Sequence, residues 1–170
     1  TKLFNEERER PLFVICDQGQ SQFFGSQHTF KSVRAAEAAS LFSWSALDHN
    51  DRVGGIVFSD TNHHEVKPAR NRKSVMQFLN YISQFNQALS IQASETPASF
   101  SLDDALTEAI RLTKPGSMIV IISDFLHLSA NTDKALSKLS EHNELLFVRT
   151  YDPLEDHLPP PGIYPVSDGN

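Results

Sequence analysis

The sequence predicts an α/β fold in which helices cover both faces of a mostly parallel sheet. Two apolar runs, PLFVICD at residues 11–17 and SMIVIISD at residues 117–124, are too short for helices and rich in Val and Ile. Such runs are typical of strands buried on both faces of a parallel sheet. Helical patterns alternate with these and further strand-like runs, an order that favours right-handed crossovers between parallel strands.

The first half of the chain is expected to alternate strand and helix. After the strand at 11–17 and a polar loop, apolar residues recur at helical spacing from Phe30 to Leu47. Residues 51–60 (DRVGGIVFSD) follow as a second strand, and residues 64–68 as a short antiparallel edge strand after a hairpin-sized connection. The apolar residues between Val75 and Leu89 repeat at intervals of three and four, which indicates the clearest amphipathic helix of the chain.

The second half repeats this alternation. A polar linker at residues 90–100 precedes a third helix that begins near Leu102 and is stopped by Pro115 and Gly116. We expect the remaining elements to be a strand at 117–123, a helix near 132–141, a strand at 145–151 and a last short strand near 163–166.

Composition limits the classes of function. The 170 residues fit one domain at 11–170, with residues 1–10 interpreted as a linker or the end of an upstream region. A net charge of −6 disfavours nucleic acid as the main partner. The single cysteine, Cys16, excludes an internal disulfide and favours a reducing compartment such as the cytoplasm. No apolar run is long enough to span a membrane, so we expect no membrane contact from this segment, while an upstream membrane region stays open.

The candidate site consists of acids at strand ends. Asp17 and Asp124 each end an apolar run, and the carboxyl ends of parallel strands meet at one edge of the sheet, where ligands of α/β proteins bind. If the two strands are neighbours, a hard cation held by oxygen atoms would relieve the repulsion between the carboxylates. The competing interpretation is that each aspartate only caps its own loop. Asp17 also opens a D-x-G-x-S pattern with Gly19 and Ser21.

Five segments of the chain, in order, resemble a known family. They are NEERERPLFVICDQGQSQFFGS, LDHNDRVGGIVFSD, LDDALTEAI, VIISDF and YDPLEDHLPPPGIYPVSD. With them the chain resembles the three-layer, Rossmann-like von Willebrand factor A fold, and more narrowly the bacterial domain of unknown function 58 family. The resemblance covers nearly the whole chain. It implies a sheet of about six strands in the order 3-2-1-4-5-6.

The resemblance also implies a metal-ion-dependent adhesion site, built from a D-x-S-x-S loop, a threonine at the head of a helix and a later aspartate. Asp17, Ser21 and Asp124 match that pattern, but Gly19 has no side-chain oxygen where the first serine would stand. Phe100 falls at the threonine position, which leaves Ser99 or Ser101 as displaced substitutes. Two alternatives stay open, a site that retains Mg²⁺ or Mn²⁺ and, favoured here, a degenerate site that still recognises a partner.

The function expected from the resemblance is protein binding without catalysis. Members of this family are associated with MoxR-type AAA+ ATPases, so such an ATPase is the expected partner, with a role in protein assembly or maturation in the bacterial cytoplasm. No catalytic residue is predicted. The expected contact residues surround the acids and comprise Gln18, Gly19, Gln20, Ser99, Ser123 and Asp152.

One enzymatic alternative rests on a specific motif. The Asp17–Gly19–Ser21 loop after an apolar strand is similar to the first phosphate loop of the actin and sugar-kinase fold, which would make the protein a nucleotide-binding enzyme. That fold needs an antiparallel hairpin next, whereas a helix is predicted from Phe30. The sequence also lacks a P-loop pattern, G-x-G-x-x-G and H-E-x-x-H.

Overall fold

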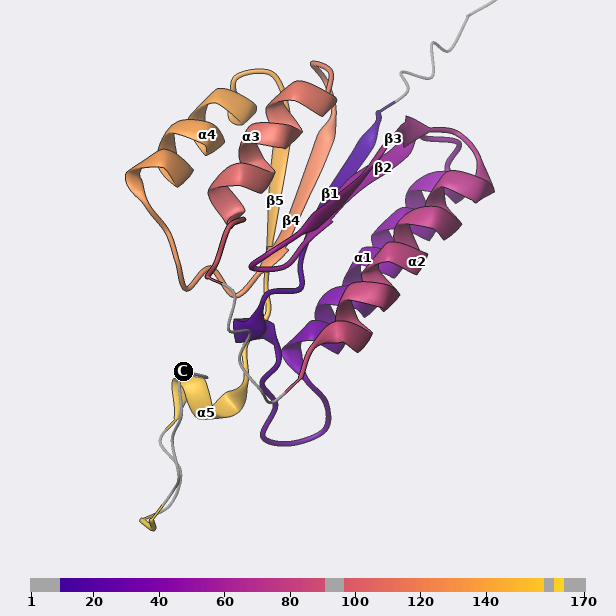
Figure 1. The fold of residues 1–170 in the computed structure, drawn as a ribbon. Coiled ribbons are helices and arrows are strands. Elements are labelled where there is room, and N and C mark those ends of the chain that lie inside the picture. Colours follow the sequence, from indigo (N-terminus) through magenta and orange to yellow (C-terminus); the bar gives the residue numbers. More distant parts are fainter. Residues whose placement is uncertain (1–9, 91–96, 158–160, 164–170) are drawn as a thin grey trace, which may run out of the picture.

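The computed structural model describes residues 10–90, 97–157 and 161–163. These residues contain one sheet of five strands in the order β3-β2-β1-β4-β5, with β1 at its centre (Figure 1). The antiparallel β3 lies at one edge, and the other pairings are parallel. The strands are β1 (Leu12–Asp17), β2 (Val53–Phe58), β3 (His63–Ala69), β4 (Met118–Ser123) and β5 (Glu144–Arg149).

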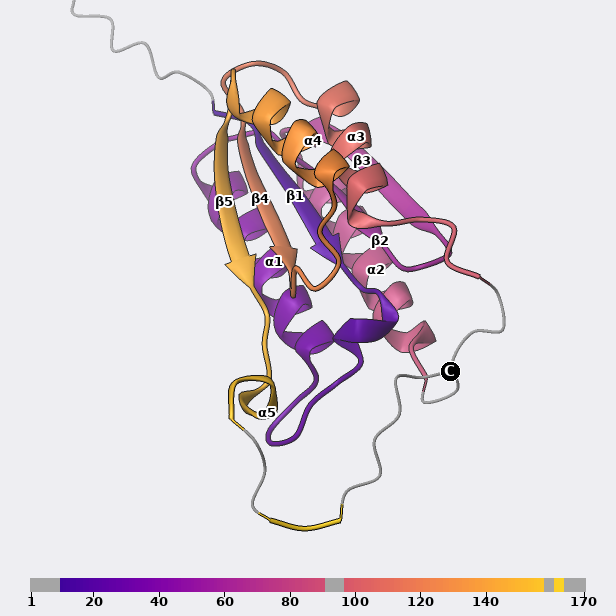
Figure 2. The same ribbon diagram turned by 90° about the vertical axis from the view of Figure 1, so that its left-hand side faces the viewer.

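Two pairs of helices cover the sheet, one pair on each face (Figures 1 and 2). α1 (Lys31–Asp48) and α2 (Arg72–Ala88) pack together on one face, and α3 (Leu102–Leu112) and α4 (Ala130–Ser140) on the other. Alternate side chains of β1 enter two separate apolar cores between these layers. Because β1 is covered on both sides, all six of its residues are buried, as its apolar sequence predicted.

The register of β1 decides where the site lies. Cys16 pairs with Val57 on β2 and with Ile122 on β4, both in parallel. The carboxyl ends of the three strands therefore lie at the same edge of the sheet, as expected for Asp17 and Asp124. At Gly55 a Cβ would come within 2.5 Å of the Phe78 ring, so a glycine there allows α2 to pack closely on β2.

The predicted elements are present with small shifts at their ends. α4 begins two residues earlier than expected, and β5 ends at Arg149, two residues before the expected end. Instead of about six strands, the described residues form five, in the expected relative order. The predicted strand at 163–166 lies outside the described residues apart from Ile163, which has no regular structure.

Two short helices complete the fold near the carboxyl ends of the strands. They are the 3₁₀ turn η1 (Gln20–Gln22) and α5 (Pro153–Asp156). Among the described helices, none combines the length and the apolar composition needed to cross a membrane.

Candidate functional site

The carboxyl ends of β1, β2, β4 and β5 and the loops that leave them form one surface, here called the crest. It comprises residues 17–31, 59–62, 123–129 and 150–157. Segments far apart in the sequence meet there, since α5 and the loop after β1 lie together at this end of the sheet (Figures 1 and 2). The crest is where the sequence placed the candidate site.

Asp17 lies beneath the surface of the crest with 8% of its area exposed. Its carboxylate accepts hydrogen bonds from the Ser123 hydroxyl at 2.6 Å and from the Gly19 amide at 2.8 Å. Burial raises the pKa of Asp17 to about 6, although these two hydrogen bonds act in the opposite direction. The nearby charges of Asp124 and Asp60 add to the upward shift.

Asp124 is paired with a buried lysine that the sequence did not reveal. Lys31, the first residue of α1, is 3% exposed, and its ammonium lies 3.0 Å from Asp124 Oδ2 and 2.5 Å from Glu155 Oε1. The side chains of Lys31 and Asp124 are 2% and 4% exposed, so this pair is shielded from water. A positive charge belonging to the chain itself thus balances the acid at the end of β4.

The segment after β5 is tied to the loop after β1. Gln22 Oε1 accepts a hydrogen bond of 2.8 Å from the hydroxyl of Thr150. Asp152 accepts from the amide and the hydroxyl of Ser26, at 2.7 Å and 2.5 Å, and caps α5 by accepting from the Leu154 amide. Asp152, one of the predicted contact residues, therefore joins the segment after β5 to the loop after β1.

The environment of Asp152 favours its charged form. Burial by itself would raise the pKa of this carboxyl, but the hydrogen bonds from Ser26 and Leu154 outweigh that effect. The charge of Lys31 acts in the same direction as the hydrogen bonds, and the pKa of Asp152 is lowered. The pKa values of Asp17, at the end of β1, and of Asp152, at the N-cap of α5, are thus shifted in opposite directions.

Other predicted contact residues differ in their access to solvent. Gln18 is fully buried and is held by hydrogen bonds to the Ser32 carbonyl, at 2.9 Å, and from the Asn86 amide, at 3.0 Å. It would have to break both bonds to contact a partner. Gln20 is partly exposed, and its backbone amide donates to Asp60 Oδ2 at 2.8 Å.

The serines and Gly19 offer few free oxygen atoms. Ser101 is exposed and caps α3, with its hydroxyl donating to Asp104 at 2.7 Å. The exposed Ser99 donates to the Thr61 carbonyl, and Ser21 lies half-buried in η1. A Cβ at Gly19 would approach Asp60 Oδ1 to 2.8 Å, so Asp60 lies where a side chain at that position would extend.

The donor set of the crest does not fit a divalent cation. Such an ion takes about six oxygen ligands, and carboxylates are its strongest ones. Here Lys31 already neutralises Asp124, Gly19 supplies no oxygen, and the Ser101 hydroxyl is engaged in its helix cap. Across the described parts of the chain, no group of three or more His, Cys, Asp or Glu side chains could hold a metal ion.

The sequence matches a known family over its full length. Residues 1–170 match the family described as "Protein of unknown function DUF58". The chain belongs to this family. No curated protein matches the sequence.

Solved structures share the fold of this DUF58 domain. The manganese-loaded TRAP protein of Plasmodium vivax is 14% identical with a TM-score of 0.54, over 86% of this chain and 60% of that one. Proximal thread matrix protein 1 of the mussel byssus is 12% identical with a TM-score of 0.55, over 82% and 36%. A von Willebrand factor type A structure from Catenulispora acidiphila is 15% identical with a TM-score of 0.49, over 82% and 32%. The DUF58 domain thus spans less than two thirds of each of these chains.

These findings confirm the predicted family and fold. The DUF58 domain has the von Willebrand factor A fold. The actin-like alternative is not supported, because β1 is followed by α1 and pairs with parallel strands on both sides. The MoxR-type partner, the metal ligands and the contact residues stay predictions.

The crest of the DUF58 domain carries an apolar rim around its buried ions. Among the described residues, ten large apolar side chains are exposed, and six of them belong to the crest. One of the rim's aromatic rings is held in place, since Phe30 stacks on Phe23 with their centroids 4.5 Å apart. Exposed apolar groups gathered at one end of a domain indicate an interaction surface. The six are Phe24, Phe30, Leu126, Leu128, Tyr151 and Leu154.

Proposed function

We propose that this DUF58 domain is a non-enzymatic protein-binding module whose crest is the contact surface. The observation that carries this proposal is the apolar rim, six exposed side chains on the loops around the buried ion pair of Lys31 and Asp124. Interfaces between proteins have an apolar centre that loses its water on binding, with polar groups already paired. The rim supplies such apolar groups, and the buried ion pair leaves no unpaired lysine charge beneath them.

The proposed binding mode does not need a metal ion. In an adhesion site of the metal-dependent kind, the cation neutralises strand-end acids. In this domain the Lys31 ammonium, at 3.0 Å from Asp124, supplies a positive charge at the corresponding acid. We therefore propose a degenerate site, in which partly exposed groups such as Gln20 and the rim contact the partner directly. The manganese in the TRAP structure is a property of that protein.

The identity of the partner rests on the family resemblance. We propose a MoxR-type AAA+ ATPase, with a role in the assembly or maturation of other proteins in the bacterial cytoplasm. Cys16 is buried and its thiol pKa is raised to about 12 by burial, which argues against a reactive thiolate.

A binding assay with matched variants tests the contact surface. The partner would be a purified MoxR-type ATPase from the native host, and the first variant carries Leu126→Ser with Leu128→Ser. The control carries Leu41→Ser with Met76→Ser, two side chains on α1 and α2 that are 73% and 50% exposed, against 55% and 57% for the crest pair. We expect the crest variant to weaken binding at least about tenfold, because rim residues lose apolar contacts only at the interface.

Two results would contradict the proposal in different ways. Equal weakening by both variants would place the contact surface elsewhere on the domain. Failure of the unaltered domain to bind the ATPase at all would remove the MoxR-type partner but not the crest as a surface. A calorimetric titration with ATP addresses the enzymatic alternative, and we expect no binding and no turnover.

A second experiment tests the proposed independence from metal. Binding of the partner would be measured in EDTA and in millimolar Mn²⁺, and we expect the same affinity in both. Calorimetry with Mn²⁺ alone should show no saturable heat in the unaltered domain. Saturable Mn²⁺ heat in the unaltered domain that is lost in Asp17→Asn would show instead that Asp17, Ser21 and Asp124 hold a cation.

A further inference from the structure

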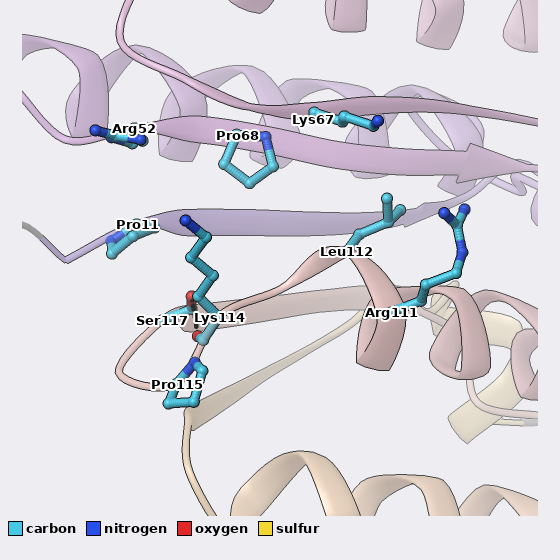
Figure 3. Close-up of a pocket in the computed structure, with 9 residues that line it drawn as sticks. All are labelled: Pro11, Arg52, Lys67, Pro68, Arg111, Leu112, Lys114, Pro115 and Ser117. Carbon is cyan, nitrogen blue, oxygen red and sulfur yellow. Dashed lines mark hydrogen bonds between the residues drawn. The ribbon is translucent and has the colours of Figure 1, made fainter.

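A cavity of about 570 Å³ lies at the end of the sheet opposite to the crest. It opens between the last residues of β3 and the loop that connects α3 to β4 (Figure 3). Four of its nine lining residues are cationic and none is acidic, in a domain whose net charge is −6. The cations are Arg52, Lys67, Arg111 and Lys114.

Among the residues that the structure describes, two of the four cations lack a balancing charge. Arg111 lies 2.9 Å from Glu65 and 2.7 Å from Glu108. Lys67 and Lys114, by contrast, are exposed, and neither forms an ion pair with any residue that the structure describes. Figure 3 shows Lys114 extending from the α3–β4 loop toward β1, whereas the Lys67 side chain lies beyond Pro68 and runs along β3. The lining therefore offers two lysine ammonium groups at separate places along the cavity.

The walls of the cavity indicate which kind of anion fits. Phosphate sites are usually built from backbone N–H groups, often at a helix N-terminus. Here three lining residues are prolines, which have no N–H, and α3 presents its C-terminal end, where carbonyl groups carry partial negative charge. Pro68, Leu112 and Pro115 instead offer apolar surface beside the lysines. This combination suits carboxylates carried on an apolar, extended segment.

We propose that this cavity binds an acidic peptide segment of a protein partner, with carboxylates at Lys67 and Lys114 and apolar side chains against Pro68 and Leu112. The apolar walls and the prolines, which offer no N–H groups, select this occupant over a phosphate compound, and the lysines supply the attraction for its carboxylates. The site lies at the opposite end of the sheet from the crest and does not depend on the function proposed for the crest. It gives the domain a second docking surface.

Fluorescence anisotropy with a defined probe tests this site. The probe is a labelled peptide of alternating glutamate and leucine, and the matched peptide has glutamine in place of glutamate. We expect saturable binding of the acidic peptide only, weakened at least about tenfold by Lys67→Glu with Lys114→Glu. The control variant, Lys73→Glu with Lys138→Glu, makes the same change of charge at exposed lysines of α2 and α4 and should keep most of the affinity.

The other outcomes each overturn the assignment. Equal loss in both double variants would show attraction by overall charge and no defined site. Competition by inorganic pyrophosphate stronger than by unlabelled peptide would make the site one for phosphates. Binding that appears only after Glu6, Glu7 and Glu9 are changed to Gln would make the chain's own N-terminal residues the occupant. The crest variant Leu126→Ser with Leu128→Ser changes exposed side chains at the other end of the sheet and should leave peptide binding unchanged, so a failure of the crest proposal is distinguishable.

Discussion

The two ends of the sheet use charged and apolar side chains in opposite ways. At the crest the ions Lys31 and Asp124 are buried and paired, while large apolar side chains are exposed around them. At the opposite end, Lys67 and Lys114 are exposed and form no ion pair with described residues, while prolines and a leucine line the walls. Buried paired ions hold segments of the chain together, whereas exposed unpaired ions are available to a ligand.

The difference between the charged residues at the two ends of the sheet has an energetic basis. Removing an ion from water costs several kcal/mol, which only a close partner and hydrogen bonds offset. An exposed ion keeps its water and contributes little to stability until a ligand displaces that water. Substitutions of charged residues should therefore change folding stability at the crest and ligand affinity at the cavity.

The largest expected effect comes from Lys31→Met, which leaves Asp124 and Glu155 without their cation. We expect the free energy of unfolding in urea to fall by about 3–5 kcal/mol, the usual result of breaking a buried pair from one side. The matched control on the same helix is Arg34→Met, which removes an exposed ion pair with Glu37 and should cost less than about 0.5 kcal/mol. Similar losses for the two variants would contradict the buried ion pair.

Adding Asp124→Asn and Glu155→Gln to Lys31→Met sharpens this test. These changes remove the carboxylates that the first substitution leaves unpaired, so they should recover part of the lost stability. No recovery would mean that Lys31 stabilises the crest through the packing of its aliphatic chain and not through its charge.

The next largest effect is the pH dependence that Asp17 gives to the stability of the domain. Its pKa is about 6 in the folded state against an ordinary 3.8, so the folded state holds the proton more tightly than the unfolded chain. The contribution of Asp17 to stability is therefore greatest at low pH and is lost as pH rises from about 4 to about 6, on the order of 3 kcal/mol in all.

Asp17→Asn isolates this contribution, because it removes the titration and keeps acceptor and donor groups for Gly19 and Ser123. Urea unfolding of both proteins at several pH values should show that the stability of the unaltered protein, relative to the variant, decreases across this window. A stability difference between the two proteins that stays constant with pH would show that folding does not raise the pKa of Asp17.

A smaller effect of the opposite sign is expected at Asp152. Its lowered pKa means that its stabilising contribution is present at neutral pH and is lost as the solution becomes acidic. Asp152→Ala should cost about 1–2 kcal/mol through the lost cap of α5 and the lost bonds to Ser26. Hydrogen exchange should quicken at the Ser26 and Leu154 amides. The control Asp156→Ala, on the same helix, removes only an exposed pair with Arg149.

The smallest effect on stability is expected at the cavity. Lys67→Ala and Lys114→Ala should each change the free energy of unfolding by less than about 0.5 kcal/mol, because both side chains are exposed and lack an ion pair among the described residues. A loss above about 1 kcal/mol in urea would show that these lysines have a structural role, as Lys31 has.

Parts of the candidate site were predictable from local pattern. The position of Asp17 and Asp124 follows from two apolar runs that end in an acid, since parallel strands bring their carboxyl ends to one edge. The same rule applied to residues 51–60 would have found Asp60, which accepts a hydrogen bond from Gln20. The exposure of contact residues was not predictable, as the full burial of Gln18 shows.

The sequence by itself determined the α/β class, the order of strands and helices, the family and the edge of the sheet at which the acids gather. These features depend on periodicity and on short motifs, which are local. Only the tertiary structure decided that Lys31, 93 residues before Asp124 and 124 before Glu155, supplies the charge that both acids share. It also decided that Lys67 and Lys114 face one cavity. The reason is physical, because the energy of a charge depends on its burial and on neighbours brought from distant parts of the chain.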